Sequence, residues 1–417
     1  MINDLPFEQR LKDASCRGCE RLGLMPVLDL GLMPPSDGLL TADRLSEPEQ
    51  KFRLDVGFCP DCSLVQILET VPPEFLFGER YLYFSSFSPT LLNHSRMNAL
   101  ELIARRELGR DSLVVELASN DGYLLKNFVE KGIPVLGIDP AKKQAEAARA
   151  IDVPTLNAFF SRELADNLVK ARKRADVVIA NNVLAHVADT HGFLDGIFTL
   201  LKDEGMAVIE VPYVRDLVDH CEFDTIYHEH LCYFSLTALD KLLRRHQMFV
   251  QDVRCLPIHG GSLRVYVTKD DVPGLRVKEL LAEEARLGID KFEYYHDFSL
   301  RVGQIREDLR SLLYGIKKAG KRIAAYGAAA KGTILLNYTG LDPSVIEYVV
   351  DRNPHKHGKF MPGVHLEILP TELLSADMPE YVLLLPWNFS EEILEQQAGY
   401  RRKDGKFIIP IPTVKVV

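Results

Sequence analysis

Short apolar runs alternate with amphipathic segments through the middle of the chain. The apolar runs have the length of buried strands, and the segments between them repeat apolar residues at helical spacing. This alternation predicts a parallel sheet with helices on its faces. The predicted strands are residues 112–117, 134–139, 175–180 and 205–212, and the predicted helices are residues 141–150, 162–172 and 193–202, after a helical stretch at about 91–110.

The same alternation returns toward the end of the chain. A charge-rich helical connector at about 278–317 leads to predicted strands at 322–326, 345–350 and 381–385. The first 75 residues differ, because their apolar runs are short and are broken by Pro, Gly and Cys. We therefore predict an α/β protein in which a small N-terminal domain precedes two doubly wound, Rossmann-like sheets. The predicted domains are residues 1–75, 76–270 and 271–417.

Composition and charge narrow the functional classes. The chain has 417 residues, of which 47% are apolar and 26% are charged, a balance typical of globular proteins. Its 50 basic and 59 acidic residues give a net charge of −9, which disfavours a nucleic-acid partner. The sequence lacks a signal-peptide pattern and an apolar run of about 18 residues, so we expect no membrane partner. We expect a cytoplasmic protein that acts as a monomer.

Four of the seven cysteines form two Cys-x-x-Cys pairs, which is metal-type spacing rather than a disulfide framework. Two such pairs complete a tetrahedral Zn²⁺ site, and four sulfur ligands leave no open position, so the site is expected to be structural. A nucleic-acid-binding zinc ribbon is an alternative that the acidic charge disfavours, and four unligated thiols are another. The predicted ligands are Cys16, Cys19, Cys59 and Cys62.

A tight turn is predicted at residues 116–122, between the first central strand and a helix that begins near Tyr123. Backbone amides of such a turn approach a nucleotide at the carboxyl edge of a parallel sheet. Ala118 and Asn120 stand where glycines are usual, so the dinucleotide pattern is incomplete. Asp139 ends the next strand, where a carboxylate accepts ribose hydroxyls. NAD and S-adenosylmethionine both fit this pattern, and Asp139 as a simple helix cap is the alternative.

Ionisable side chains crowd residues 224–230, and aromatic residues and Cys232 around them indicate partial burial. Buried titratable groups in clefts tend to be functional. A solvated loop is the alternative interpretation. Metal binding by His228 and His230 is a further alternative, but no third ligand is evident and the H-E-x-x-H pattern is absent.

A second nucleotide-type turn is predicted at residues 326–332, after a strand and before a helix, and Asp351 ends the next strand. Read alone, this turn is compatible with an NAD(P)-dependent oxidoreductase. The turn lacks repeated glycines, however, and Lys331 suits a diphosphate at the start of a helix. Arg352 and Lys356 add basic groups nearby, with an exposed basic loop as the alternative.

Four motifs together resemble those of bacterial sugar C-methyltransferases. The two cysteine pairs together form one of these motifs, and residues 116–122, 227–230 and 326–332 form the other three. The resemblance therefore runs from about residue 14 to beyond 400. It implies a zinc-binding domain, a central methyltransferase domain that binds S-adenosylmethionine, and a C-terminal Rossmann-like domain that helps to hold a nucleotide-linked keto-deoxysugar. The implied cofactor site is Glu116, Ser119, Asn120, Gly122, Asp139, Asn157, Phe159 and Asn181.

The resemblance also implies an acid–base site. C-methylation next to a ketone needs a base, for which a neutral imidazole is suited, and a donor to the developing oxyanion. His230 is the implied base, with Glu229 and Tyr227 beside it and with His186 facing the sugar, although a histidine in that place is commonly a structural hydrogen-bonding group. The implied reaction removes a proton alpha to a 4-keto group, at C3, and methylates that carbon; O- or N-methylation would need no ketone.

Further site residues follow from the same resemblance. A tyrosine of the stretch 81–86 is implied to reach the active site, and alternation directs Tyr81 and Tyr83 to opposite sides, so either is a candidate. The glycines of residues 258–264 allow a close approach of strand and ligand. The implied substrate-binding residues are His259, Arg264, Lys331, Arg352 and Lys356.

Overall fold

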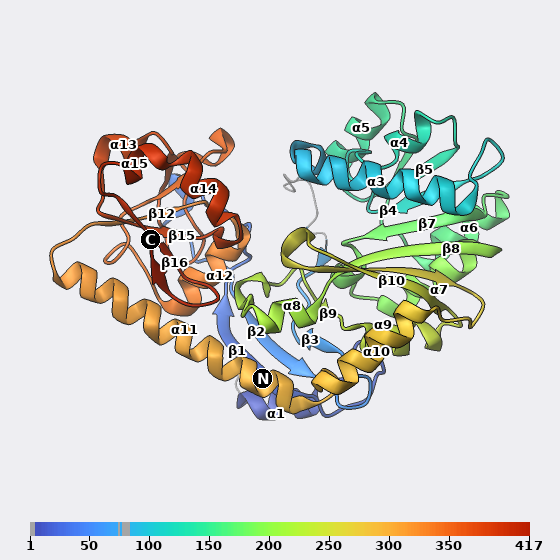
Figure 1. Ribbon diagram of the computed structural model, residues 1–417, viewed down its shortest axis with the longest axis horizontal. Helices are drawn as coiled ribbons and strands as arrows, with labels where there is room; N and C mark the ends of the chain where they lie inside the picture. The colour runs from blue at the N-terminus through green and yellow to red at the C-terminus, as the bar shows by residue number, and fades with distance from the viewer. Residues whose placement is uncertain (1–4, 74–75, 77–83) are drawn as a thin grey trace.

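The computed structural model describes residues 5–73, 76 and 84–417. Three sheets organise these residues (Figure 1). The N-terminal sheet has four strands, the central sheet has seven and the C-terminal sheet has six. The predicted fold class, with two Rossmann-like sheets behind a small N-terminal domain, is confirmed. No helix of the described residues is both long and apolar enough to cross a membrane.

The N-terminal unit is built on an antiparallel sheet with strand order β1-β2-β3-β9. Its last strand comes from the middle of the chain, where Val65 pairs with Tyr233 and Gln66 pairs with Cys232. The small unit therefore holds a piece of the segment that carries the predicted acid–base residues. Its elements are α1 (Phe7–Asp13), β1 (Met25–Met33), η2 (Ala42–Arg44), β2 (Phe52–Phe58), β3 (Val65–Ile67) and β9 (Cys232–Tyr233).

The central unit has strand order β10-β11-β8-β7-β4-β5-β6. The five strands from β8 to β6 are parallel, and β11 is antiparallel to β8 and to β10. Strands β4 and β5 are buried along their whole length, as expected when helices cover both faces. The strands are β4 (Val114–Leu117), β5 (Val135–Asp139), β6 (Thr155–Asn157), β7 (Ala175–Asn181), β8 (Leu201–Pro212), β10 (Phe249–Leu256) and β11 (Ser262–Thr268).

The helices of the central unit lie between these strands. Helix α9 buries its leucines against the sheet, and the side chain of Ser235 caps it by accepting from the Ala238 amide. The helices and short turns are η3 (Ser85–Phe87), α3 (Pro89–Arg106), α4 (Lys126–Val129), α5 (Lys142–Ala150), α6 (Arg162–Lys170), η4 (Leu184–His186), α7 (Thr190–Leu200), α8 (Val214–Asp219), η5 (Phe223–Thr225), α9 (Leu236–Arg245) and η6 (Ile258–Gly260).

The C-terminal unit has strand order β14-β13-β12-β15-β16-β17, parallel except for β17. Helices α10 and α11 run below the molecule and connect it to the central unit (Figure 1). Its elements are α10 (Leu275–Leu287), α11 (Phe292–Lys318), β12 (Ile323–Tyr326), α12 (Ala330–Thr339), β13 (Val349–Asp351), η7 (Pro354–Lys356), β14 (Ile368–Pro370), α13 (Leu373–Asp377), β15 (Tyr381–Leu384), η8 (Trp387–Phe389), α14 (Ser390–Gln396), α15 (Ala398–Arg401), β16 (Lys406–Ile409) and β17 (Lys415–Val416).

Three predicted elements differ from the observed ones. The helix predicted near Tyr123 begins only at Lys126, because turns fill the residues between. The predicted helix 193–202 starts earlier, at Thr190, where the Asp189 carboxylate accepts from an amide of the first turn, and its last two residues belong to β8. The strand predicted at 345–350 is limited to β13, because its first residues form a turn on Asp342.

Candidate active site

A large cavity of about 780 Å³ is lined by residues from all three units. Its wall includes the residues that follow β4, β5 and β7, which is the edge of a parallel sheet where ligands bind in α/β proteins. Asp37 of the N-terminal unit and Lys331 of the C-terminal unit also line it. The predicted site residues in its wall are Asn120, Asp139, Phe159, Asn181, His186, Tyr227, Glu229, His230 and Lys331.

The turn after β4 adopts the tight conformation without the usual glycines. Ala118 and Asn120 have φ angles of 54° and 48°, which lie in the left-handed region that glycine occupies in related turns. Gly122 has a φ of 77°, and a Cβ there would lie 3.1 Å from the Val153 side chain. The incomplete glycine pattern is therefore compatible with a cofactor turn.

Asp139 connects the cofactor turn to the next strand. Its two carboxylate oxygens accept hydrogen bonds from the amides of Asn120 and Ala141, each at 2.8 Å. The capping interpretation of this residue is thus part of its role. Each oxygen can accept a second hydrogen bond, and Asp139 lines the cavity. Burial raises the pKa of Asp139 to about 6, and the two amide bonds oppose this shift.

Several predicted cofactor residues lie behind the cavity wall rather than in it. Glu116 is buried, and burial together with the charges of Asp139 and Asp121 raises its pKa well above the ordinary value. One oxygen of Glu116 and the hydroxyl of Ser119 have no hydrogen-bond partner in the described structure. Such orphaned polar atoms beneath the turn fit a site that a polar cofactor completes.

Asn157 supports the cavity wall from outside. Its side-chain amide donates to the carbonyl oxygens of Asp139 and Pro140, at 3.0 and 2.8 Å, so it fixes the loop after β5. On the other side of the turn, Asn120 accepts from the Ser85 amide at 3.0 Å. Tyr81 and Tyr83, the two tyrosines predicted as candidates to reach the active site, lie outside the described residues.

The imidazole of His230 is fixed by a hydrogen bond to the backbone. Its Nδ1 lies 3.0 Å from the carbonyl oxygen of Thr225, which only accepts, so Nδ1 carries the proton and Nε2 is the basic nitrogen of the neutral ring. The ring centroids of Tyr227 and His186 lie 4.2 and 4.8 Å away. This arrangement suits a general base beside a hydroxyl donor.

The neighbours of His230 have shifted pKa values. Burial lowers the pKa of His186 to about 4, so this imidazole is neutral near pH 7. Burial and the charge of Asp37 raise the pKa of Glu229 to about 8. A protonated Glu229 carboxyl is a hydrogen-bond donor at neutral pH. His186 and Glu229 are therefore both uncharged near pH 7. They form a partly apolar part of the cavity wall that contains hydrogen-bond donors.

His228 has a different orientation from His230. Its Nε2 donates to the Arg53 carbonyl of β2 at 3.2 Å, and its ring meets the edge of Phe52. The two histidines thus bond to separate parts of the chain, and the predicted alternative of a shared metal ion has no support. Within the part of the chain that the structure describes, the group suited to a metal is the set of four cysteines.

The four cysteines fit a tetrahedral zinc site. The Sγ atoms of Cys16 and Cys62 are 3.4 Å apart, those of Cys19 and Cys59 are 3.5 Å apart, and all four lie within 4.8 Å of one another. Zinc–sulfur bonds of about 2.3 Å place tetrahedral ligands at about 3.8 Å, close to this spacing. All four side chains are buried, so a bound ion has a structural role.

The C-terminal unit adds residues that the sequence pattern does not reveal. Trp387 Nε1 donates to the buried Asp224 carboxylate at 2.8 Å. Lys331 lies 4.5 Å from the Trp387 ring centroid and donates to the side-chain oxygen of Asn388 at 3.0 Å. The signals available in the sequence were weak: Trp387 is the single tryptophan of the chain, and Asp224 belongs to the ionisable cluster. Nothing in the pattern singles out Asp37.

Three of the remaining predicted substrate residues, Arg264, Arg352 and Lys356, do not line the cavity. Arg264 forms a buried ion pair of 2.8 Å with Glu210, because it lies on the face of β11 that packs on β8 and α3. Arg352 is an exposed residue that donates to Gln396 at 3.2 Å. Lys356 donates to the Ala328 carbonyl and so holds the second turn. His259 lies in the turn η6, and its side chain is outside the described part.

The second turn is built differently from a dinucleotide site. A Cβ on Gly327 would lie 2.5 Å from Pro386, so the proline ring occupies the space above the glycine that a pyrophosphate would need. The Asp351 carboxylate accepts from the amides of Ala328 and Asn353, each at 2.7 Å. These contacts disfavour the oxidoreductase alternative.

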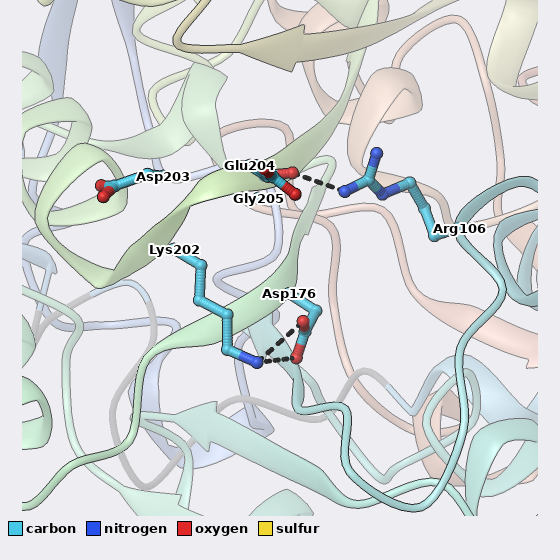
Figure 2. A pocket seen from close by; sticks show the side chains of 6 residues that line it. All are labelled: Arg106, Asp176, Lys202, Asp203, Glu204 and Gly205. Atoms are coloured by element: carbon cyan, nitrogen blue, oxygen red, sulfur yellow. Dashed lines mark hydrogen bonds and ion pairs between the residues drawn. The ribbon is translucent and has the colours of Figure 1, made fainter.

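A smaller hollow lies at the opposite edge of the central sheet (Figure 2). Lys202 and Asp176 form an ion pair of 2.8 Å there, and Arg106 donates to the backbone carbonyl of Glu204. Asp176 and Lys202 lie at the amino ends of β7 and β8, and Arg106 is the last residue of α3. The hollow is therefore a surface ion-pair cluster.

Comparison with known proteins places the chain in a family. The family model described as "C-methyltransferase C-terminal domain" matches residues 257–412, the model described as "Methyltransferase domain" matches residues 93–250, and the model described as "Putative zinc binding domain" matches residues 16–77. The C-methyltransferase NovU of Streptomyces niveus is 35% identical over 405 residues, which are 96% of each chain.

Other relatives match only part of this chain. A ubiquinone biosynthesis O-methyltransferase of Rhodopseudomonas palustris is 29% identical over 96 residues, 23% of this chain and 38% of that protein. The crystal structure of an S-adenosylmethionine-dependent methyltransferase from Clostridium acetobutylicum aligns with a TM-score of 0.35 and 14% identity, over 44% of this chain and 92% of the other. The full-length match to NovU and the matching domains show that the chain belongs to the family of S-adenosylmethionine-dependent, zinc-binding C-methyltransferases.

Proposed function

We propose that this C-methyltransferase acts on a nucleotide-linked deoxysugar and methylates the carbon alpha to its keto group, at C3 of a 4-keto sugar. The observation that carries the proposal is the fixed tautomer of His230 in a cavity shared with the cofactor turn. A neutral imidazole with a basic Nε2 removes a proton from carbon only if that carbon is acidified, and a neighbouring ketone provides this acidity.

The cofactor is proposed to be held by Asn120, Asp139, Phe159 and Asn181. Asp139 accepts the ribose hydroxyls through its remaining acceptor sites, and Phe159 covers the adenine. The Asn181 side-chain oxygen has no hydrogen-bond partner in the described structure, and it lines the cavity, so it suits the amino group of the methionine part. When bound, S-adenosylmethionine supplies a methyl group on a positively charged sulfur.

The chain's own residues are proposed to generate and stabilise the carbanion. Nε2 of His230 takes the proton from the alpha carbon, and the electron pair of the broken C–H bond spreads to the ketone oxygen as an enolate. The hydroxyl of Tyr227 and the protonated carboxyl of Glu229 donate hydrogen bonds to that oxygen. The alpha carbon would then accept the methyl group as the methyl–sulfur bond breaks and its electron pair stays on the sulfur, which leaves S-adenosylhomocysteine. The proton stays on His230 until solvent removes it.

The C-terminal unit is proposed to bind the nucleotide part of the substrate. Lys331 lies in the first turn of α12 and lines the cavity, so its charge and the helix N-terminus both favour a diphosphate. The proposed division into residues 1–75, 76–270 and 271–417 then gives each unit one task. Residues of a single chain line the cavity, which supports a monomer as the working form.

Exchange of the alpha proton with solvent tests the proposed base directly. Keto-sugar nucleotides are incubated in D₂O with the protein and S-adenosylhomocysteine, and the loss of the proton signal is followed by NMR. The wild-type protein is expected to catalyse the exchange, whereas His230→Asn should reduce its rate at least about 100-fold. His296→Asn, on the outer helix α11, is the matched control. Wild-type exchange in His230→Asn would exclude this residue as the base.

A further inference from the structure

Three successive side chains of η8 reach the cavity region in different ways. Trp387 bonds to Asp224, and Asn388 accepts from Lys331 at 3.0 Å. Phe389 lines the cavity, yet it is 56% exposed. An aromatic ring that stays exposed inside a cavity leaves a large apolar face in water, and a flat ligand that covers this face is stabilised.

A second exposed ring lines the same cavity from the central unit. Phe159 is 46% exposed and follows β6, close in sequence to Asn157, which bonds to the Asp139 carbonyl. Among the described residues of the cavity wall, Phe159 and Phe389 are the large apolar side chains with this degree of exposure. The two rings belong to different units, and each stands beside a different set of polar groups.

The polar neighbours distinguish the two rings. Phe159 shares the cofactor side with Asp139, where adenosine is expected. Phe389 is adjacent in sequence to Asn388, whose oxygen holds the Lys331 ammonium at the start of α12. A diphosphate at Lys331 therefore brings the nucleoside attached to it next to Phe389.

We infer that Phe389 is the stacking platform for the nucleobase of the sugar nucleotide. The inference rests on the proposed function, because it requires a substrate that carries a nucleoside diphosphate. Methyl donor and substrate bring one base each, and the cavity offers one exposed aromatic ring on each side. Stacking on an aromatic ring tolerates different bases, since every base has a π-face, so Phe389 contributes affinity rather than choice of base.

Titration calorimetry on the full-length protein tests this role. dTDP and UDP are titrated in the presence of saturating S-adenosylhomocysteine, which keeps them out of the adenosine site. Phe389→Leu retains an apolar side chain but removes the ring, and it is expected to weaken both nucleotides about 10-fold. Phe389→Tyr keeps the ring and should bind them within about twofold of the wild-type affinity.

Phe159→Leu is the matched control on the other side of the cavity. It is expected to weaken S-adenosylhomocysteine and to leave the affinity for dTDP and UDP unchanged. The melting temperature checks that each variant is folded, and the exposure of both rings predicts little change.

The outcomes separate the two proposals. Wild-type affinity of Phe389→Leu for dTDP and UDP, or equal losses in Phe389→Leu and Phe389→Tyr, would overturn the stacking role alone. Failure of the wild-type protein to bind any nucleoside diphosphate, while it still binds S-adenosylhomocysteine, would overturn the proposed substrate class and this inference with it.

Discussion

The indole nitrogen of Trp387 lies 2.8 Å from a carboxylate oxygen of Asp224, and this bond joins the C-terminal unit to the segment that carries His230. Asp224 directly precedes Thr225, whose carbonyl fixes the His230 ring. The other Asp224 oxygen has no hydrogen-bond partner in the described structure. The position of the proposed base thus depends on a contact between two units.

Replacing Trp387 with Phe removes the hydrogen bond that this indole donates to the buried Asp224 side chain. An unpaired buried carboxylate costs about 1–3 kcal/mol, so we expect Trp387→Phe to lower the free energy of unfolding by that amount and to reduce kcat. Urea unfolding and steady-state kinetics measure the two effects. Asp224→Asn keeps an acceptor oxygen for the indole and should be milder. Equal stability of Trp387→Phe and the wild-type protein would contradict this account.

The raised pKa of Glu229 leads us to expect an upper limit to the pH range of activity. Burial and the charge of Asp37 raise the pKa of Glu229 to about 8, and the proposed role requires the protonated form. We therefore expect kcat to fall as the pH rises through about 8. Asp37→Asn removes one cause of the shift, so the fall should move to lower pH, whereas Asp43→Asn on the exposed part of the same unit should leave it in place. An identical profile for Asp37→Asn would show that Asp37 does not act on Glu229.

Glu222 predicts a pH dependence of stability. Burial raises its pKa from the ordinary 4.5 to about 8, although Lys331 opposes the shift. Between these values the folded state binds more protons than the unfolded state, so this group makes the free energy of unfolding fall as the pH rises from about 4.5 to about 8. Glu222→Gln should flatten this decline, and Glu279→Gln on the exposed face of α10 should not. Denaturant unfolding at several pH values measures the slope.

Removal of zinc is expected to affect both stability and the acid–base segment. The second cysteine pair is followed by β3, which pairs with β9 two residues after His230. We expect one zinc ion per chain by metal analysis, and a lower melting temperature in Cys59→Ser. kcat should fall more than the affinity for S-adenosylhomocysteine, because the cofactor turn belongs to another sheet. Cys255→Ser, an exposed cysteine, is the control. Full activity of a metal-free protein would contradict the coupling.

We expect the Asp139 side chain to contribute to the affinity for the cofactor. Asp139→Ala removes the acceptors of two backbone amides and the proposed acceptors of the ribose hydroxyls, so we expect S-adenosylhomocysteine to bind at least about 10-fold more weakly. Calorimetry measures the loss, and Asp152→Asn, an exposed acid at the end of α5, serves as the control. Unchanged affinity in Asp139→Ala would place the ribose elsewhere.

Local patterns in the sequence predicted the parallel sheets well, because a buried parallel strand is a continuous apolar run and the turn that follows it is short. The cysteine pairs and residues 224–230 were visible for the same reason: their chemistry is concentrated in few positions. Strand β9 was not predicted, because two residues are too few to show an alternating pattern. In addition, more than half of the central unit lies between β3 and β9 in the sequence.

The contributions of Asp37, Trp387 and Phe389 depend on how units far apart in the sequence pack together, and no local pattern encodes that packing. Arg264 shows the opposite difficulty. Its basic side chain suggested a substrate contact, but its strand directs it to a buried ion pair with Glu210. Alternation along a strand tells which residues share a face, but not which face meets the ligand.

The pairing of β3 with β9 also sets how this chain can be divided. A fragment that ends before β9 would expose the backbone groups of Val65–Ile67 as an open strand edge, and such edges recruit other chains. The N-terminal region is thus not a domain that can be separated from the rest of the chain, although it contains all four cysteine ligands. Any chimera that exchanges this region between relatives has to carry the matching residues 224–233 as well. Otherwise, β3 of one relative would have to pair with β9 of another.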